Sequence, residues 1–160
     1  MAIVILVLFC ALMAAAAAYD LLTFRIPNAI VALLLALFLV PAWIHWRQID
    51  WLLQIVPALG CLAIGYLLFA RGYFGAGDAK LLAVAALWAG TNALMPLLLF
   101  VSLSGLLVML VLLALRRLWP RIAPPAASAP AVLKPGAGVP YGVAIAAGSI
   151  LTMLLFSQII

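Results

Sequence analysis

Acidic side chains are the residues of this chain best suited to catalysis, and there are only three of them: Asp20, Asp50 and Asp78. Asp20 precedes the turn segment Arg25-Ile26-Pro27-Asn28, and Asp78 closes Gly75-Ala76-Gly77-Asp78. A carboxylate beside long apolar segments is costly, so each one needs an explanation. Two carboxyl groups can hydrolyse a peptide bond, because an ionised one takes a proton from water while a protonated one donates toward the scissile carbonyl. Asp20 and Asp78 are therefore a candidate catalytic pair.

No other set of side chains offers comparable chemistry. His45 is the only histidine, and Cys10 and Cys61 lack a second cysteine at metal-binding or redox spacing. No Cys/His pair is placed together, and the serines lack a nearby base on the side of the aspartates. The sequence therefore predicts neither a metal nor a cofactor, and the two aspartates are the one catalytic set it offers.

Composition places nearly the whole chain in a lipid bilayer. The chain is 71% hydrophobic and 7% charged, with a mean hydropathy of +1.44. We expect one all-α membrane domain over residues 1–160, a polytopic bundle of about six helices whose first span is retained. Residues 79–115 would form a helix of about 55 Å, too long for a hydrocarbon layer of about 30 Å, so they must turn back near Gly90-Thr91-Asn92. The predicted spans are 2–19, 29–44, 52–70, 79–90, 94–115 and 141–158.

Basic residues predict the orientation. With six spans, seven of the eight basic residues lie in the first, third and fifth loops, and Arg47 alone lies in the second. The positive-inside rule then places both termini outside and puts Asp20 and Asp78 on the cytoplasmic side. Asp50 falls on the other side, where we expect a structural role. Because the basic residues are scattered between spans, no nucleic-acid partner is predicted.

Residues 116–140 contain six prolines and few large apolar side chains after Trp119. This composition predicts a disordered or extended cytoplasmic linker without evident chemistry.

The two aspartates differ in their predicted helix positions. Asp78 lies where a helix begins, at the positive end of its dipole, whereas Asp20 lies near the end of the first helix. We therefore expect Asp78 to be the more readily ionised partner and Asp20 to hold the shared proton.

Three segments in order resemble the type IV prepilin peptidases, membrane aspartyl proteases of the Gly-x-Gly-Asp class. They are Asp20 with Ile26-Pro27-Asn28, then Phe74-Gly75-Ala76-Gly77-Asp78-Ala79-Lys80, then Pro140-Tyr141-Gly142 with Gly148. The resemblance implies that Asp20 and Asp78 are catalytic. It also implies that the substrates are prepilin-like precursors, which are themselves apolar helices with a short basic leader that is removed at the cytoplasmic face of the bacterial inner membrane. The cysteine pairs of larger members are missing, so no methyl transfer is predicted, and the chain looks like the short peptidases of tight-adherence (Flp) pili.

The remaining motif residues have site-shaping roles by this resemblance and simpler roles by local structure. Pro27 and Asn28 suit a turn, Gly142 and Gly148 suit close helix packing, and Lys80 suits a determinant of topology. The residues expected to shape the site are Gly75, Gly77, Ile26, Pro27, Asn28, Lys80, Pro140, Tyr141 and Gly142.

Two other functions are compatible with two aspartates near the membrane surface. A small proton- or cation-coupled transporter would use Asp20 and Asp78 to bind the ion, although it would not explain their turn motifs. A non-enzymatic membrane assembly subunit would use them only to fix helix ends. The sequence assigns no oligomeric state.

Overall fold

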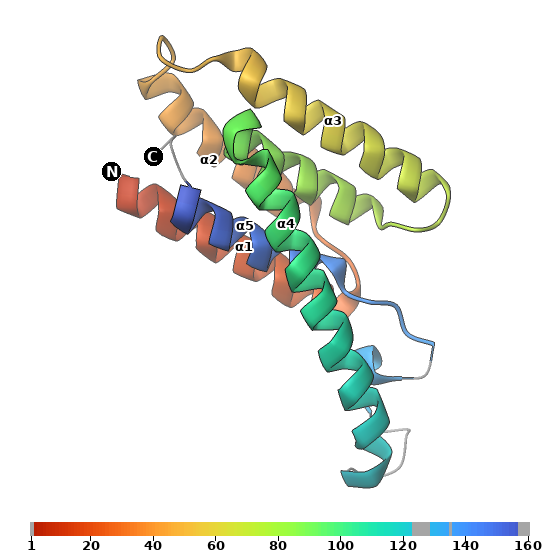
Figure 1. Cartoon of the computed structure of the whole chain (residues 1–160). Helices are drawn as coiled ribbons and strands as arrows, with labels where there is room; N and C mark the ends of the chain where they lie inside the picture. Colours follow the sequence, from red (N-terminus) through yellow and green to blue (C-terminus); the bar gives the residue numbers. More distant parts are fainter. Residues whose placement is uncertain (1, 123–128, 135, 157–160) are drawn as a thin grey trace.

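The computed structural model describes residues 2–122, 129–134 and 136–156, and these residues are helical apart from their connections. The elements are α1 (Ala2–Thr23), α2 (Asn28–Ile44), α3 (Trp51–Ala70), α4 (Ala76–Ile122), the short 3₁₀ helix η2 (Ala131–Leu133) and α5 (Tyr141–Phe156). Figure 1 shows the helices packed side by side as a bundle, with the far end of α4 projecting beyond it. The predicted all-α fold is confirmed. Residues 157–158 of the last predicted span lie outside the described residues.

Helix α4 is two helices joined at Gly90. This residue has φ 62° and ψ −177°, a backbone conformation that is strained for residues with a side chain. A Cβ atom here would also lie only 2.7 Å from Oε1 of Gln54. The chain reverses direction at this point, as Figure 1 shows, so the predicted turn near residues 90–92 is confirmed.

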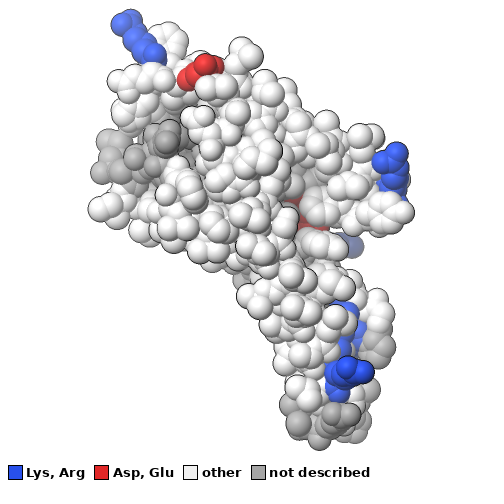
Figure 2. All heavy atoms as spheres, in the orientation of Figure 1, with Lys and Arg blue, Asp and Glu red and all other residues white. Residues whose placement is uncertain are grey.

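The helices suit a bilayer. Helices α1, α3 and α4 are long and apolar enough to span one, and α2 and α5 are shorter apolar helices. Large aliphatic side chains cover the outer surface, which is mostly uncharged in Figure 2. The start of α1, the end of α5 and the turn after α2 lie at one end of the bundle (Figure 1). The side of the membrane that this end faces is a prediction from the sequence.

Trp88 is the centre of the core. Its side chain is fully buried, its Nε1–H donates to the carbonyl oxygen of Leu34 at 3.2 Å, and its ring lies against Phe9 and Phe38. These contacts join α1, α2 and the first part of α4, the helices that carry or adjoin the two aspartates.

Small residues let the other helices approach closely. A Cβ atom on Gly65 of α3 would lie 2.8 Å from the Cβ of Ala79, the residue after Asp78 in α4. On α5, Gly148 faces the backbone of Val101 in the second part of α4. Such contacts between small residues are common in membrane bundles, because they bring helix backbones close together. They fix α3, α4 and α5 around the aspartate end of the bundle.

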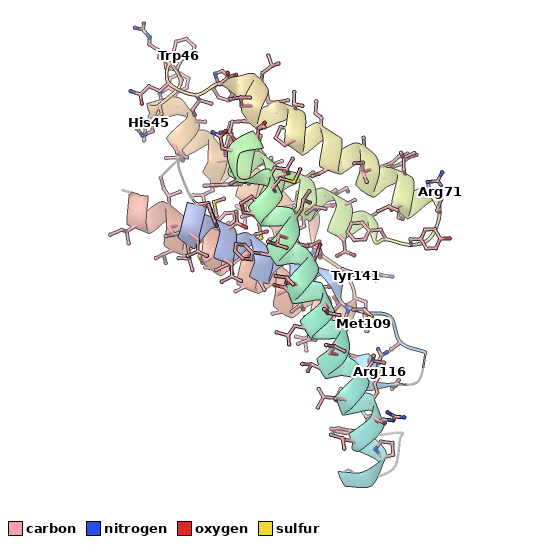
Figure 3. The ribbon with its side chains drawn as sticks, in the orientation of Figure 1. His45, Trp46, Arg71, Met109, Arg116 and Tyr141 are labelled. Atoms are coloured by element: carbon pink, nitrogen blue, oxygen red, sulfur yellow. The ribbon has the colours of Figure 1, made fainter. Side chains whose placement is uncertain are left out.

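The prediction of a disordered or extended linker over residues 116–140 is wrong for residues 116–122, which are helical, and for the described residues after 128, which are bonded to α4. Helix α4 continues to Ile122, because Arg and Leu favour helix and Pro120 lies within the last turn, where it disturbs few hydrogen bonds. The Arg116 guanidinium donates to the carbonyl oxygens of Val132, Ala137 and Gly138 at 2.8–3.0 Å, and Figure 3 shows Arg116 on this part of α4. The segment is thus folded back on α4. Residues 123–128 and 135 lie outside the described residues.

Candidate active site

Asp20 lies in the last turn of α1 and is 4% exposed. Its Oδ2 accepts a hydrogen bond of 2.7 Å from the backbone N–H of Gly142, in the first turn of α5. The N–H groups of a first helical turn have no partner within the helix, and they carry the positive end of the dipole. Residues 122 positions apart are therefore joined by a bond suited to a carboxylate.

Asp78 lies in the first turn of α4 and is 8% exposed. Its carboxylate lies against the backbone of Gly75, three residues earlier. An acidic side chain that reaches back to the residue before the helix is one half of a capping box. The contact leaves no space for a side chain on Gly75, where a Cβ atom would lie 2.5 Å from Oδ2 of Asp78.

One cavity of about 380 Å³ joins the two aspartates. The carboxylates are close enough to interact electrostatically across it. A water molecule occupies roughly 30 Å³ in the liquid, so the cavity has room for water and a peptide group. Figure 2 shows acidic atoms within a recess of the surface, in keeping with their burial. The cavity is lined by Asp20, Phe24, Arg25, Ile26, Asn28, Gly75, Ala76, Gly77, Asp78 and Lys80.

The loop between α1 and α2 closes this cavity. Pro27 precedes α2 at its N-terminus, with φ −61°. The side chain of Ile26 packs between two helix starts, since Cβ atoms on Gly77 and Gly142 would lie 3.1 Å and 2.9 Å from it. Nζ of Lys80 donates to Oδ1 of Asn28 at 3.0 Å, which ties the start of α2 to α4. The turn predicted at residues 27–28 is present, and it also holds two helices together.

Known proteins provide one decisive comparison. The model of the type IV leader peptidase family matches residues 7–110, which is more than half of the chain and includes both cavity aspartates. The chain belongs to the type IV leader peptidase family. This membership identifies it as a protease and confirms the resemblance predicted from the motifs. No curated protein and no solved structure matches the chain.

The family match ends before α5, yet a residue of α5 holds the carboxylate of Asp20. Pro140 is buried before the helix, Gly142 bonds to Asp20, and the ring of Tyr141 lies 5.7 Å from that of Phe74. The structure thus brings Gly142 to Asp20 and places Tyr141 beside the segment that leads into Asp78.

These contacts bear on two predictions. Gly75 and Gly77 leave space beside the cavity: neither has a positive φ, and a Cβ atom on either would press against Asp78 or Ile26. The prediction that Asp20 holds the shared proton loses its physical basis, because it placed the carboxylate at the negative end of the α1 dipole. Asp20 ends α1, but its carboxylate lies at the N-terminus of α5, so each aspartate has a helix N-terminus as its partner.

Sequence reasoning missed Phe24, which lines the cavity of this peptidase. Phe24 has φ 53°, a left-handed conformation that is rare for a bulky residue, and its N–H donates to the carbonyl oxygen of Asp20. It ends α1 in the way that glycine usually ends a helix. Because no glycine or asparagine occupies this position, no local pattern indicates the left-handed conformation.

The third aspartate and the histidine lie apart from the site. Asp50 is exposed and caps α3, since its Oδ1 accepts hydrogen bonds from the N–H groups of Leu52 and Leu53. His45 lies at the other end of the bundle from Arg71, as Figure 3 shows. Within the described ranges 2–122, 129–134 and 136–156, no three His, Cys, Asp or Glu side chains come together as a set of metal ligands.

Proposed function

We propose that this chain is an aspartic endopeptidase that removes the short basic leader from prepilin-like precursors at the cytoplasmic face of the bacterial inner membrane. One observation carries the proposal: two buried carboxylates line one cavity, and each lies against the backbone at the start of a helix. Membership in the leader peptidase family gives the substrate class.

The proposed mechanism uses both aspartates on one water molecule. Two carboxylates in a buried cavity repel each other when both are charged, so the pair holds a single proton at neutral pH. The charged carboxylate takes a proton from the water molecule while the oxygen of that water attacks the scissile carbonyl carbon. The protonated partner donates to the carbonyl oxygen, which gives a tetrahedral diol. The C–N bond then breaks as the proton gained from water passes to the leaving amine, and one hydroxyl of the diol returns a proton to the partner carboxylate.

Backbone contacts orient this pair. Gly142 donates to Oδ2 of Asp20, so Oδ1 is the oxygen that faces the water. The backbone of Gly75 lies against the carboxylate of Asp78. The backbone at the start of a helix has little freedom to move, so these contacts keep each carboxylate in place during the reaction.

A cleavage assay tests the proposal. Purified wild-type protein is incubated in detergent or liposomes with a pilin-like precursor from the same organism, beside Asp20→Asn, Asp78→Asn and the matched control Asp50→Asn. We expect a shortened precursor with wild type and the control, and none with the two cavity variants. Cleavage by either cavity variant at the wild-type rate would overturn the proposal. Ion flux without cleavage would point to the transporter, and neither activity to an assembly subunit.

A further inference from the structure

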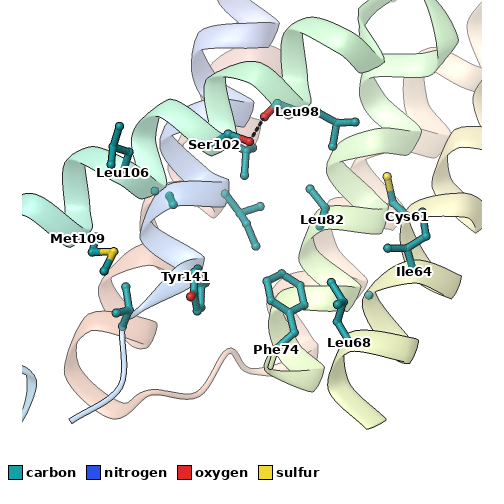
Figure 4. Close-up of a pocket in the computed structure, with 16 residues that line it drawn as sticks. Cys61, Ile64, Leu68, Phe74, Leu82, Leu98, Ser102, Leu106, Met109 and Tyr141 are labelled. Carbon is teal, nitrogen blue, oxygen red and sulfur yellow. Dashed lines mark hydrogen bonds between the residues drawn. The ribbon is translucent and has the colours of Figure 1, made fainter. Parts of the chain in front are cut away.

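A second hollow, larger than the aspartate cavity, opens between α3, both parts of α4 and α5. It has a volume of about 520 Å³, within the range of roughly 300–1,000 Å³ typical of binding sites. Its lining is almost entirely apolar, and the hydroxyl group of Ser102 is already bonded to the carbonyl oxygen of Leu98 (Figure 4). We call it the apolar groove, and its main side chains are Ile64, Leu68, Phe74, Leu98, Leu106 and Tyr141.

One end of the apolar groove lies next to the residues that contact the two aspartates. Phe74 and Tyr141 face each other across that end in Figure 4, with ring centroids 5.7 Å apart. The next residue after each of them contacts a carboxylate: the backbone of Gly75 lies against Asp78, and Gly142 donates to Asp20. We call these two glycines the carboxylate anchors. The aromatic pair therefore lies between an apolar surface and the residues that contact both carboxylates.

A rival groove approaches the aspartate cavity from another side. It has a volume of about 310 Å³ and lies between α2, α3 and the first part of α4, with Leu59 and Leu62 in its wall. It shares one lining residue with the aspartate cavity, Lys80, whose side chain is exposed and bonded to Asn28, whereas the apolar groove shares none. Neither carboxylate anchor, however, follows directly in the chain from a residue that lines the rival groove.

We propose that the apolar groove docks the apolar helix that follows the leader in the precursor, and that Phe74 and Tyr141 mark where the substrate leaves the groove for the aspartates. This inference rests on the proposed function, which supplies the substrate. A lipid chain or a second copy of this chain would suit an apolar surface too. Only a segment joined covalently to a scissile peptide, however, gains from a groove that ends at both carboxylate anchors.

Substitution of Leu106 tests the docking. Leu106 and Leu107 are neighbours on α4 and are 55% and 63% exposed, but only Leu106 lines the groove. Leu106→Trp should fill the groove and lower kcat/KM for the full precursor roughly tenfold to a hundredfold, the effect of excluding one large apolar side chain. Leu107→Trp is the helix-matched control, and Leu59→Trp fills the rival groove.

A short substrate separates docking from catalysis. A soluble peptide that spans the leader and the cleavage site, without the apolar helix, does not need the groove. Its cleavage should be equal in wild type and Leu106→Trp. Equal loss on both substrates would show a damaged site and overturn the inference, as would a loss that only Leu59→Trp produces. If wild type cleaves neither substrate, the proposed function fails and not the docking.

Crosslinking tests the occupant directly and without turnover. A benzophenone amino acid replaces Leu106, or Leu107 as the control, in the Asp78→Asn variant reconstituted with the full precursor. We expect a crosslink to the apolar helix of the precursor from position 106 and not from position 107. Crosslinks from position 106 only to lipid, or only to a second copy of the chain, would overturn the proposal. A crosslink to the precursor would support docking even if cleavage were absent.

Discussion

The substitution Gly142→Ala adds one methyl group beside the carboxylate of Asp20. The new Cβ atom would lie 2.8 Å from Oδ2 of Asp20 and 2.9 Å from Cδ1 of Ile26. Carbon atoms in ordinary contact are about 3.5–4.0 Å apart, so the carboxylate and the isoleucine must both shift. Asp20 then loses its hydrogen bond of 2.7 Å to the N–H of residue 142, or keeps it only in a distorted form.

The magnitude follows from the type of bond. A hydrogen bond to a charged group contributes about 1.5–3 kcal/mol, which corresponds to a fall of roughly tenfold to 150-fold in kcat/KM if the orientation of Asp20 is needed for the reaction. Helix propensity acts in the other direction, because alanine is favoured over glycine by up to about 1 kcal/mol inside a helix. Gly142→Ala should therefore lose activity with little loss of stability.

The assay follows shortening of the precursor on a gel over time, beside thermal unfolding of the same detergent-solubilised sample. The matched control for activity is Gly60→Ala, since a Cβ atom on Gly60 would have no atom within 4 Å. Gly105→Ala serves as a control for stability alone, because its Cβ meets only the Cβ of Ala144, at an ordinary 3.6 Å, but Gly105 lines the apolar groove. Activity of Gly142→Ala within about twofold of wild type, with normal stability, would refute the reasoning: Asp20 would then not depend on this bond.

Three further substitutions test the supporting contacts. Arg116→Gln removes the donors that hold η2 and the segment after it, so about 1.5–3 kcal/mol of local stability is lost and backbone amide exchange in residues 129–134 should speed up. The exposed Arg117→Gln is the control and should leave the exchange rate unchanged. Unchanged exchange in both variants would contradict the contact. Lys80→Met should cost at most about 1 kcal/mol in thermal unfolding because its bond is exposed, and an activity loss above about tenfold would instead give Lys80 a role in the reaction. Gly148→Ala should destabilise by about 1–3 kcal/mol, because its Cβ would meet helix backbone that cannot yield, and an unfolding temperature equal to that of Gly105→Ala would disprove this.

Hydropathy and charge predicted much of the fold because the bilayer imposes simple lengths. An uninterrupted helix over residues 79–115 would exceed the membrane, and Gly90 is where the chain does break. The end of α4 was not predictable in the same way. Proline content suggested a linker after residue 116, whereas the donors of Arg116 find carbonyl partners that are close only in the folded chain.

The site was predictable as a set of residues and not as a set of contacts. The motif around Asp78 is local, and the contact between its carboxylate and Gly75 spans only three residues. The sequence therefore indicates this contact. The bond from Gly142 to Asp20 crosses the whole chain, and no local pattern indicates which helix start meets the end of α1. The left-handed Phe24 shows the same limit, because its conformation is set by tertiary contacts rather than by its own preference.

The bond between Asp20 and Gly142 has a consequence for biosynthesis. Asp20 enters the membrane with the first helix to be made, but the donor that holds its carboxylate arrives only with the last described one. A nascent chain that has inserted α1 to α4 therefore contains both aspartates without the arrangement that orients them. Proteolytic competence should appear late, once α5 has joined the bundle, so that a partly translated chain poses no danger to its neighbours.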